Sequence, residues 1–369
     1  TLTWEKVTTL DLGLDARFFN DALGVTFDWY NRTTSDILTT ANLPATLGAD
    51  APYENMGTIQ TKGWELAIDY RHTFKNGLHF GVTASVADDK TEVTKWTYNT
   101  KIPSYGATGW WDKSAYKEGM VLGDIWGLQF DRFLTEDDFN ADGSLKAGLP
   151  DQTKVFPAGY QFAPGDVLYK DLDNNGEIVK QTNTNDKGDL SVIGNALPRL
   201  QFGLNLDAAW KGFDISMFFQ GVAKRKLWAA GNQVLPGFTT GEPFYKGAED
   251  YWTPENTDAF YPRPMDYKQS ASGNYSVNDR YLLNMAYLRL KTFTVGYSLP
   301  KVWLSKFKVQ GLRVYFTGEN LFTIDGVKPA IDPEIGIRTA SGKSDQRNFG
   351  RSYPYQKLSL IHISEPTRL

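Results

Sequence analysis

Cysteine is absent from the 369 residues, and histidine occurs only as His72, His79 and His362. Without cysteine there is no thiolate nucleophile, disulfide framework or cysteine-ligated zinc site, and three scattered histidines nearly exclude a histidine-rich metal centre. Basic and acidic residues almost cancel, at 39 against 43. Because no basic surplus is available to neutralise phosphates, nucleic acid is not an expected partner.

Long apolar stretches are also missing, since no run approaches the ~20 residues of a membrane-spanning helix. The first residues, TLTWEK, lack the basic and apolar regions of a signal peptide. We therefore expect either a cytosolic protein or a chain whose beginning is missing. The hydrophobic content of 41% is close to the globular average and excludes wholesale disorder.

The strongest pattern present is an alternation of apolar and polar residues. It is strict between Thr9 and Phe18, where the even positions are apolar and the odd positions are polar or glycine. Successive side chains of a strand point to opposite faces, so the alternation predicts a strand with one apolar and one polar face. The same pattern recurs over residues 23–29, 64–70, 78–86, 200–208 and 213–219.

Three antiparallel hairpins follow from these segments. Directly opposed residues share a face, so the parity of the two apolar sets fixes whether the loop is even or odd. The short loops at residues 20–21, 75–77 and 211–212 all satisfy this condition. The first is expected to pair Phe18 with Leu23, and the third Ala208 with Ile215.

Later strands are predicted over residues 287–299 and from residue 312 to the segment 318–322, with a β-bulge near Lys291 and Thr292, where the apolar parity switches. Long connections rich in aromatic residues cover residues 97–197 and 223–281. We expect these to fold, because compact domains rarely contain structureless loops longer than ~12–15 residues. Short turns at one end and long loops at the other are typical of an outer-membrane barrel.

Alternation alone is compatible with a β-sandwich or a transmembrane barrel. Segments of about ten residues suit a tilted membrane strand better than a globular one. Large aromatic residues stand beside the short turns, where an interfacial girdle would lie, as Phe18, Phe19, Phe74, Trp210 and Phe213. These features favour an all-β antiparallel transmembrane barrel. The alternative is a secreted β-sandwich that binds or hydrolyses polysaccharide.

Six stretches, in this order, resemble the SusC/RagA-type TonB-dependent transporters of the outer membrane. The first runs from residue 2 to residue 38, and the others are ENMGTIQTKGWEL, GDVLYKDLDNNGEI, IGNALPRLQFGLNL, YLRLKTFTVGYSLPK and VYFTGENLF. The resemblance covers almost everything from Leu2 to about Lys357. It implies that residues 1–358 are the C-terminal portion of a barrel of ~22 strands.

The resemblance also implies a function, which is energised import of oligosaccharides or peptides through the outer membrane, without enzymatic activity. The implied partners are a SusD-like surface lipoprotein and the TonB complex, which acts through an N-terminal region missing from this chain. Residues 359–369 (SLIHISEPTRL) depart from the family pattern, because Pro366 interrupts them and no terminal aromatic residue follows. We expect these residues to be a non-native tail.

Two candidate sites lie in the long loops. Asp171, Asp173 and Asn175 occupy positions 1, 3 and 5 of a loop with glycine at position 6, followed by Glu177. This spacing suits a Ca²⁺ or Mg²⁺ ion in the loop of residues 171–182. Position 12 is threonine rather than glutamate, although Asp186 and Asp189 follow, so an Asx-rich turn is the alternative.

The second candidate is a set of tryptophans, Trp110, Trp111 and Trp126, in the longest loop. Exposed indole rings could stack on the CH-rich faces of sugars. The alternative is that they pack within the loop or contact the lipoprotein, since large aromatic residues are more often packed than exposed. Walker, Rossmann, HExxH and GxSxG motifs do not occur in the sequence, so no catalytic residue is assigned.

Overall fold

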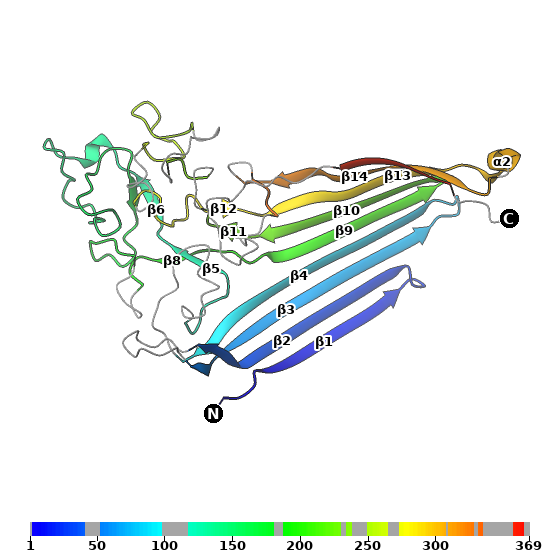
Figure 1. Cartoon of the computed structure of the whole chain (residues 1–369), viewed down its shortest axis with the longest axis horizontal. Coiled ribbons are helices and arrows are strands. Elements are labelled where there is room, and N and C mark those ends of the chain that lie inside the picture. Colours follow the sequence, from blue (N-terminus) through cyan, green and yellow to red (C-terminus); the bar gives the residue numbers. More distant parts are fainter. Residues whose placement is uncertain are drawn as a thin grey trace.

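The computed structural model describes residues 2–40, 52–97, 117–180, 187–229, 234–237, 249–264, 273–307, 309–327, 331–334 and 357–364. In this part of the chain the dominant element is one antiparallel sheet of nine strands, in the order β1-β2-β3-β4-β9-β10-β13-β14-β15 (Figure 1). The strands are β1 (Lys6–Phe18), β2 (Leu23–Thr40), β3 (Tyr53–Thr73), β4 (His79–Trp96), β9 (Arg199–Trp210), β10 (Phe213–Lys224), β13 (Tyr287–Ser298), β14 (Leu312–Asp325) and β15 (Lys357–Ser364).

The hairpin registers agree with the parity argument. Phe18 pairs with Leu23, and Ala208 pairs with Ile215. In the hairpin between β3 and β4, Gly77 has a positive φ of 79°, which a residue without Cβ adopts without strain. The bulge is confirmed as well, because the pairing of β13 with both neighbours skips Lys291.

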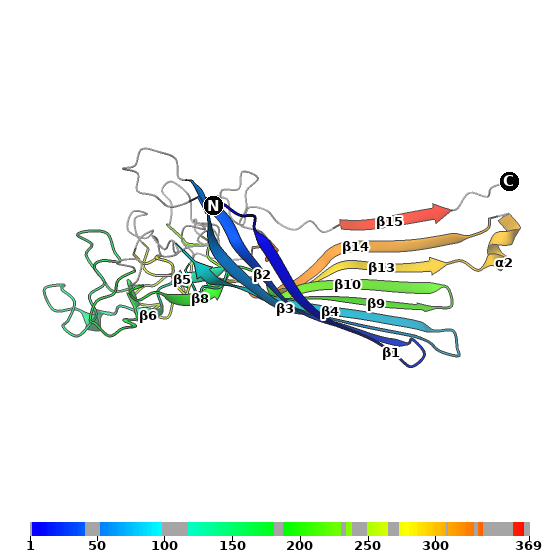
Figure 2. The same cartoon turned by 90° about the horizontal axis from the view of Figure 1, so that it is seen from below.

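The strands are long and the sheet is twisted. β3 has 21 residues and β2 has 18, several times the ~5–6 residues of an average globular strand. Figure 2 shows β1 and β2 running at an angle to β13 and β14, as expected when strands tilt to form a barrel wall. β1 and β15 are not neighbours, so the described sheet is open.

The two ends of the sheet differ. The tight turns lie at one end, and at the other the long connections form smaller elements (Figure 1). These are β5 (Asp124–Gly127) with β8 (Ser191–Asn195), β6 (Phe130–Phe133) with β7 (Val167–Tyr169), β11 (Lys226–Leu227) with β12 (Leu283–Asn284), and the 3-10 helix η4 (Glu136–Asp138). We call these small elements, at the end of the sheet opposite the tight turns, the outer layer. Two large buried hydrophobic clusters lie in it, so the aromatic connections do fold in the described residues.

The apolar face of the sheet carries no second layer in the described ranges. Its large side chains are solvent-accessible; Leu12, for example, is 59% exposed. A β-sandwich would bury this face against another sheet, and the sandwich alternative is therefore wrong. Other exposed members of this face are Leu10, Leu14, Phe27, Ile68, Phe80, Phe213, Val295 and Val314.

Two further observations concern the sheet and the membrane. No helix among the described residues is long and apolar enough to span a bilayer. Residues 357–364 form β15, whose backbone pairs with β14 from Leu312 to Glu319. Backbone pairing does not test the origin of a segment, so the assignment of residues 359–369 as a non-native tail stays a prediction.

Candidate functional site on the polar wall of the sheet

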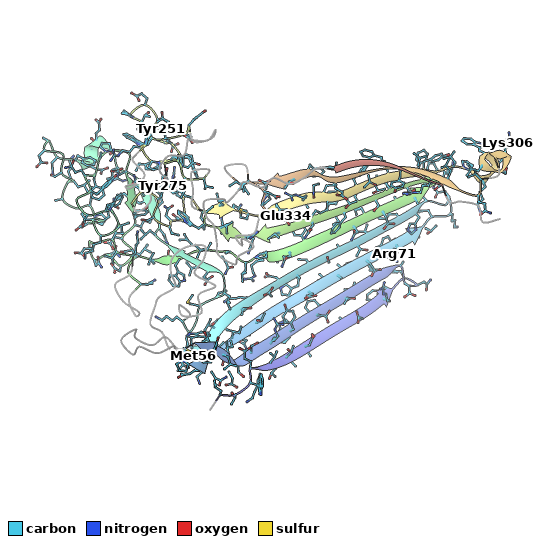
Figure 3. All side chains as sticks on the ribbon, in the orientation of Figure 1. Met56, Arg71, Tyr251, Tyr275, Lys306 and Glu334 are labelled. Atoms are coloured by element: carbon cyan, nitrogen blue, oxygen red, sulfur yellow. The ribbon has the colours of Figure 1, made fainter. Side chains whose placement is uncertain are left out.

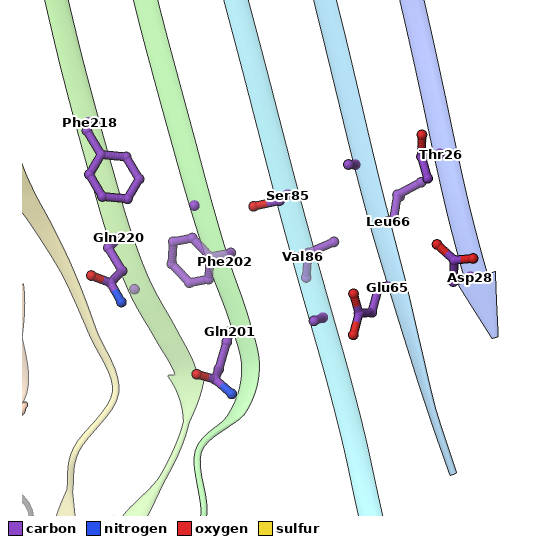
Figure 4. Close-up of a pocket in the computed structure, with 14 residues that line it drawn as sticks. Thr26, Asp28, Glu65, Leu66, Ser85, Val86, Gln201, Phe202, Phe218 and Gln220 are labelled. Carbon is purple, nitrogen blue, oxygen red and sulfur yellow. The ribbon is translucent and has the colours of Figure 1, made fainter. Parts of the chain in front are cut away.

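The polar face of the sheet contains a hollow formed by small residues. Because the strands are in register, Ala67 of β3 faces Ser85 of β4, which in turn faces Gly203 of β9. Ala87 lies beside them in the next row. These short side chains leave a recess of ≈ 500 Å³ between larger polar groups (Figure 4).

The rim of this recess is chemically asymmetric. Asp28 of β2 and Glu65 of β3 lie on one side, and Gln201, Gln220 and Phe218 of β9 and β10 lie on the other (Figure 4). Carboxylates accept hydrogen bonds, amides both donate and accept them, and the phenylalanine ring offers an apolar surface. The wall can therefore make several weak contacts with a polar solute.

Asp28 and Glu65 are direct partners in the β2–β3 register. Like charges placed opposite each other destabilise a sheet. Among the described ion pairs, neither carboxylate has a basic partner. This side of the recess therefore presents uncompensated negative charge.

A different arrangement compensates charge near the tight turns. Arg17 of β1 donates a hydrogen bond of 2.8 Å from Nη1 to Asp69 Oδ2 of β3, across the intervening strand β2. Gly24 of β2 is the register partner of both residues. A Cβ at Gly24 would lie 2.2 Å from Arg17 Nη1, so only glycine leaves room for this ion pair.

A similar ion pair lies near the other edge of the sheet. Arg313 of β14 donates from Nε to Asp214 Oδ1 of β10 at 3.0 Å. Gly296 of β13 is the register partner of Asp214, whereas Arg313 faces Ser298 and its side chain reaches diagonally over Gly296. A Cβ at Gly296 would lie 2.6 Å from Arg313 Nη2. We call these two arrangements the three-strand ion pairs. Each connects strands that are not neighbours in the sheet.

In the outer layer, Trp126 lies in β5 and packs, partly buried, against a hydrophobic cluster that includes Leu128. Its indole Nε1 is buried and has no hydrogen-bond partner among the described residues. This position agrees with the packing alternative, and a role in sugar stacking stays a prediction. Trp110 and Trp111 lie outside the described residues.

A buried polar centre in the outer layer was not predicted from the sequence. Asp166 is fully buried and accepts hydrogen bonds from Tyr160 Oη at 2.9 Å and from Arg263 Nε at 2.8 Å. Burial and the Asp166 carboxylate raise the pKa of Tyr160. Asp166 and Arg263 are 97 residues apart, so no local motif could indicate their contact.

The candidate cation loop brings together part of the predicted set and one further residue. Carboxylate oxygens of Asp171, Asp173 and Asp189 lie within 4.8 Å of one another. Asn175 Oδ1 instead accepts the backbone N–H of Glu177 at 2.7 Å. The Glu177 carboxylate forms an ion pair with Lys154.

Crowding of the carboxylates in this cluster affects the pKa of one of them. Partial desolvation and the nearby carboxylates of Asp189 and Asp171 raise the pKa of Asp173. Asp189 has no exposed surface and accepts backbone N–H groups of Leu172 and Val179, each at 2.8 Å. These bonds satisfy Asp189 without a metal, as in the Asx-turn alternative, and the cation stays a prediction.

Calorimetric titration of the whole protein with Ca²⁺ tests this prediction. We expect binding that is weakened at least several-fold by Asp171→Asn, because the loop then loses a charged oxygen ligand. Asp142→Asn is the matched control, since Asp142 holds an exposed Asx turn through Ser144 in the same layer. Absence of heat with the unaltered protein would leave the loop as a simple turn.

Comparison with known proteins agrees with this architecture. Residues 1–162 match the family described as TonB dependent receptor-like, beta-barrel. The chain is 28% identical over 361 residues to TonB-dependent receptor P3 of Formosa agariphila, which covers 95% of this chain and 33% of that protein. It is 24% identical over 343 residues to TonB-dependent receptor SusC of Bacteroides thetaiotaomicron, covering 90% of this chain and 30% of SusC.

Solved structures show the same fold. The RagAB peptide importer in the closed-closed state aligns with a TM-score of 0.66 at 20% identity, covering 98% of this chain and 35% of that one. The structure of the RagAB peptide transporter aligns with a TM-score of 0.65, also at 20% identity, covering 91% of this chain and 33% of that one. This chain thus spans about a third of the length of its relatives.

An open sheet with an apolar outer face, a polar inner face, tight turns at one end and long folded loops at the other is the wall of an outer-membrane β-barrel. With the matches above, the chain is similar in sequence and fold to part of the barrel of TonB-dependent receptors of the SusC/RagA type. The resemblance seen in the sequence is confirmed, and the protein lies in the outer membrane.

Proposed function

We propose that this wall lines the passage of an importer that takes up oligosaccharides or peptides together with a SusD-like surface lipoprotein. The TonB complex would supply energy from the periplasm through parts of the receptor outside this chain. The observation that carries the proposal is the polar inner face, with its recess of ≈ 500 Å³. Transport through such a passage requires no covalent chemistry.

The groups around the recess support passage of a hydrogen-bonding solute. Gln201 and Gln220 offer donors and acceptors on one side, and Glu65 offers acceptors on the other. A passage works when contacts are strong enough to admit a solute and weak enough to release it. An open recess with a few separate polar groups meets that condition for sugars and for peptides alike.

The outer layer supports contact with a surface lipoprotein. Its two hydrophobic clusters and the buried ion pair between Asp166 and Arg263 give it a core of its own. A folded surface requires less ordering on binding than a flexible loop does. We therefore infer that the lipoprotein rests on this layer.

Uptake by cells that carry the full-length receptor tests the proposal. We expect accumulation of a labelled oligosaccharide or a labelled peptide, and we expect it to stop when TonB is deleted. A passive porin would continue to admit the solute without TonB, and that outcome would contradict energised import. Deletion of the gene for the SusD-like lipoprotein should lower uptake at limiting solute concentration.

A double variant tests the recess separately. Asp28→Asn with Glu65→Gln removes the opposed charges, and we expect uptake of a cationic peptide to fall several-fold because the wall loses its attraction for positive charge. Asp137→Asn with Asp142→Asn, both exposed in the outer layer, is the control for the loss of two charges. Unchanged uptake would exclude the recess from solute contact while leaving TonB dependence intact.

A further inference from the structure

The connection between β13 and β14 differs from the other turns at its end of the sheet. The other hairpins there turn within residues 19–22, 74–78 and 211–212. This one takes residues 299–311 and includes the short helix α2 (Lys301–Leu304) and the 3-10 helix η5 (Ser305–Phe307). Figures 1 and 2 show α2 beyond the ends of the strands.

Two large apolar side chains of this helix are exposed to solvent in the described structure. Val302 is 75% exposed and Trp303 is 59% exposed, whereas Leu304 is only 5% exposed. Leu304 therefore anchors the helix, and its two neighbours are left without cover in the described structure. Adjacent exposed apolar residues of this size usually mark a site of interaction.

Charge in this connection has one sign. Its sequence, LPKVWLSKFKVQG, contains three lysines and no acidic residue, in a chain of net charge −4. Lys301 and Lys306 are exposed (Figure 3 labels Lys306). Neither lysine takes part in an ion pair among the described residues.

The position of the helix indicates what covers it. The tight turns lie at the same end of the sheet, where Phe19 in the β1–β2 turn and Phe213 at the start of β10 are exposed. Lys211 Nζ also lies 4.4 Å from the ring centroid of Trp210 there. Aromatic residues beside lysines are typical of the boundary between hydrocarbon and headgroups. Short turns of such barrels face the periplasm.

We propose that residues 299–311 are an interfacial anchor on the periplasmic leaflet of the outer membrane. Val302 and Trp303 insert at the boundary between acyl chains and headgroups, and Lys301 and Lys306 contact the phosphates of glycerophospholipids. The anchor continues the apolar outer face of the barrel past the last strand residues. It fixes the height of β13 and β14 in the bilayer, whatever solute the receptor carries.

Fluorescence quenching tests the anchor in the full-length receptor, reconstituted in nanodiscs of phosphatidylethanolamine and phosphatidylglycerol. This chain has no cysteine, so Val302→Cys introduces one labelling site into it for an environment-sensitive fluorophore. We expect blue-shifted emission and loss of most of the signal with brominated phospholipids. The same label at Asp142→Cys, in the outer layer, should emit as in water and resist quenching.

Two additional variants make the result decisive. Heat-modifiable gel migration reports whether each cysteine variant folds. A label at Trp303→Cys should give the same blue shift and quenching as the label at Val302→Cys, so it replaces that variant if Val302→Cys does not fold. Lys301→Glu with Lys306→Glu should reduce quenching of the label at residue 302 in nanodiscs that contain phosphatidylglycerol. A red-shifted, unquenched label at residue 302 would overturn the proposal. Protection of that label only by the periplasmic domain of TonB would overturn it too, in favour of a protein partner.

Discussion

Replacing Arg289 by alanine is expected to destabilise the receptor by about 3–5 kcal/mol, the range seen when one partner of a buried ion pair is removed. The Arg289 side chain is 1% exposed, and its guanidinium donates to Asp332 and to Glu334 at 2.5 Å each. Its Nε also donates to Thr323 Oγ1 at 2.7 Å. The variant leaves two carboxylates at the outer end of the wall without this partner.

Urea unfolding of the full-length receptor in lipid vesicles, followed by gel migration, measures this effect. Lys291→Ala is the matched control, because Lys291 contacts the same Glu334 but its side chain is 25% exposed. Its loss should have a smaller effect, about 0–1 kcal/mol, as for other solvent-accessible ion pairs. Equal effects of the two variants would show that burial of Arg289 is not what stabilises residues 331–334 against the sheet.

Gly221→Ala is expected to lower the free energy of unfolding by about 1–3 kcal/mol, as overpacking does elsewhere. A Cβ at Gly221 would lie 2.3 Å from Phe202 Cζ and 2.4 Å from the carbonyl oxygen of Tyr287. The ring could turn, but the carbonyl belongs to the backbone of β13. Relief of the clash therefore requires β10 and β13 to separate near the bulge.

A glycine on the same wall provides the control. A Cβ at Gly203 would first meet Ser85 Oγ at 3.2 Å, so Gly203→Ala requires only a small adjustment. We expect the folded fraction of the receptor, measured by gel migration before and after heating, to fall for Gly221→Ala and to stay close to that of the unaltered protein for Gly203→Ala. A similar loss in both variants would indicate that strand glycines matter for reasons other than contact with Tyr287.

The local parts of the fold could be predicted because period-two alternation fixes both face and register. That argument placed Phe18 opposite Leu23 and a bulge near Lys291 and Thr292, and both are confirmed. It could not show that β4 pairs with β9, since about a hundred residues separate these strands. Pairing between segments so far apart in the sequence depends on assembly of the whole sheet rather than on any local pattern.

The site was less predictable, since it depends on contacts between distant segments. Spacing alone identified Asp171 and Asp173; among the described residues the fold brings Asp189 beside them, and Asp186 lies outside the described residues. The recess of the inner wall was missed because its floor consists of alanine, serine and glycine. Small residues carry no chemical signal until the register aligns them.

The three-strand ion pairs have a consequence for how such receptors diverge. Each consists of an arginine, an aspartate and a glycine on three consecutive strands, as with Arg17, Gly24 and Asp69. Loss of either charge would leave the other unpaired and remove the need for glycine, while a bulkier residue at the glycine would separate the charges. The three positions therefore form one inherited unit, and we expect kindred sequences to keep or exchange all three together.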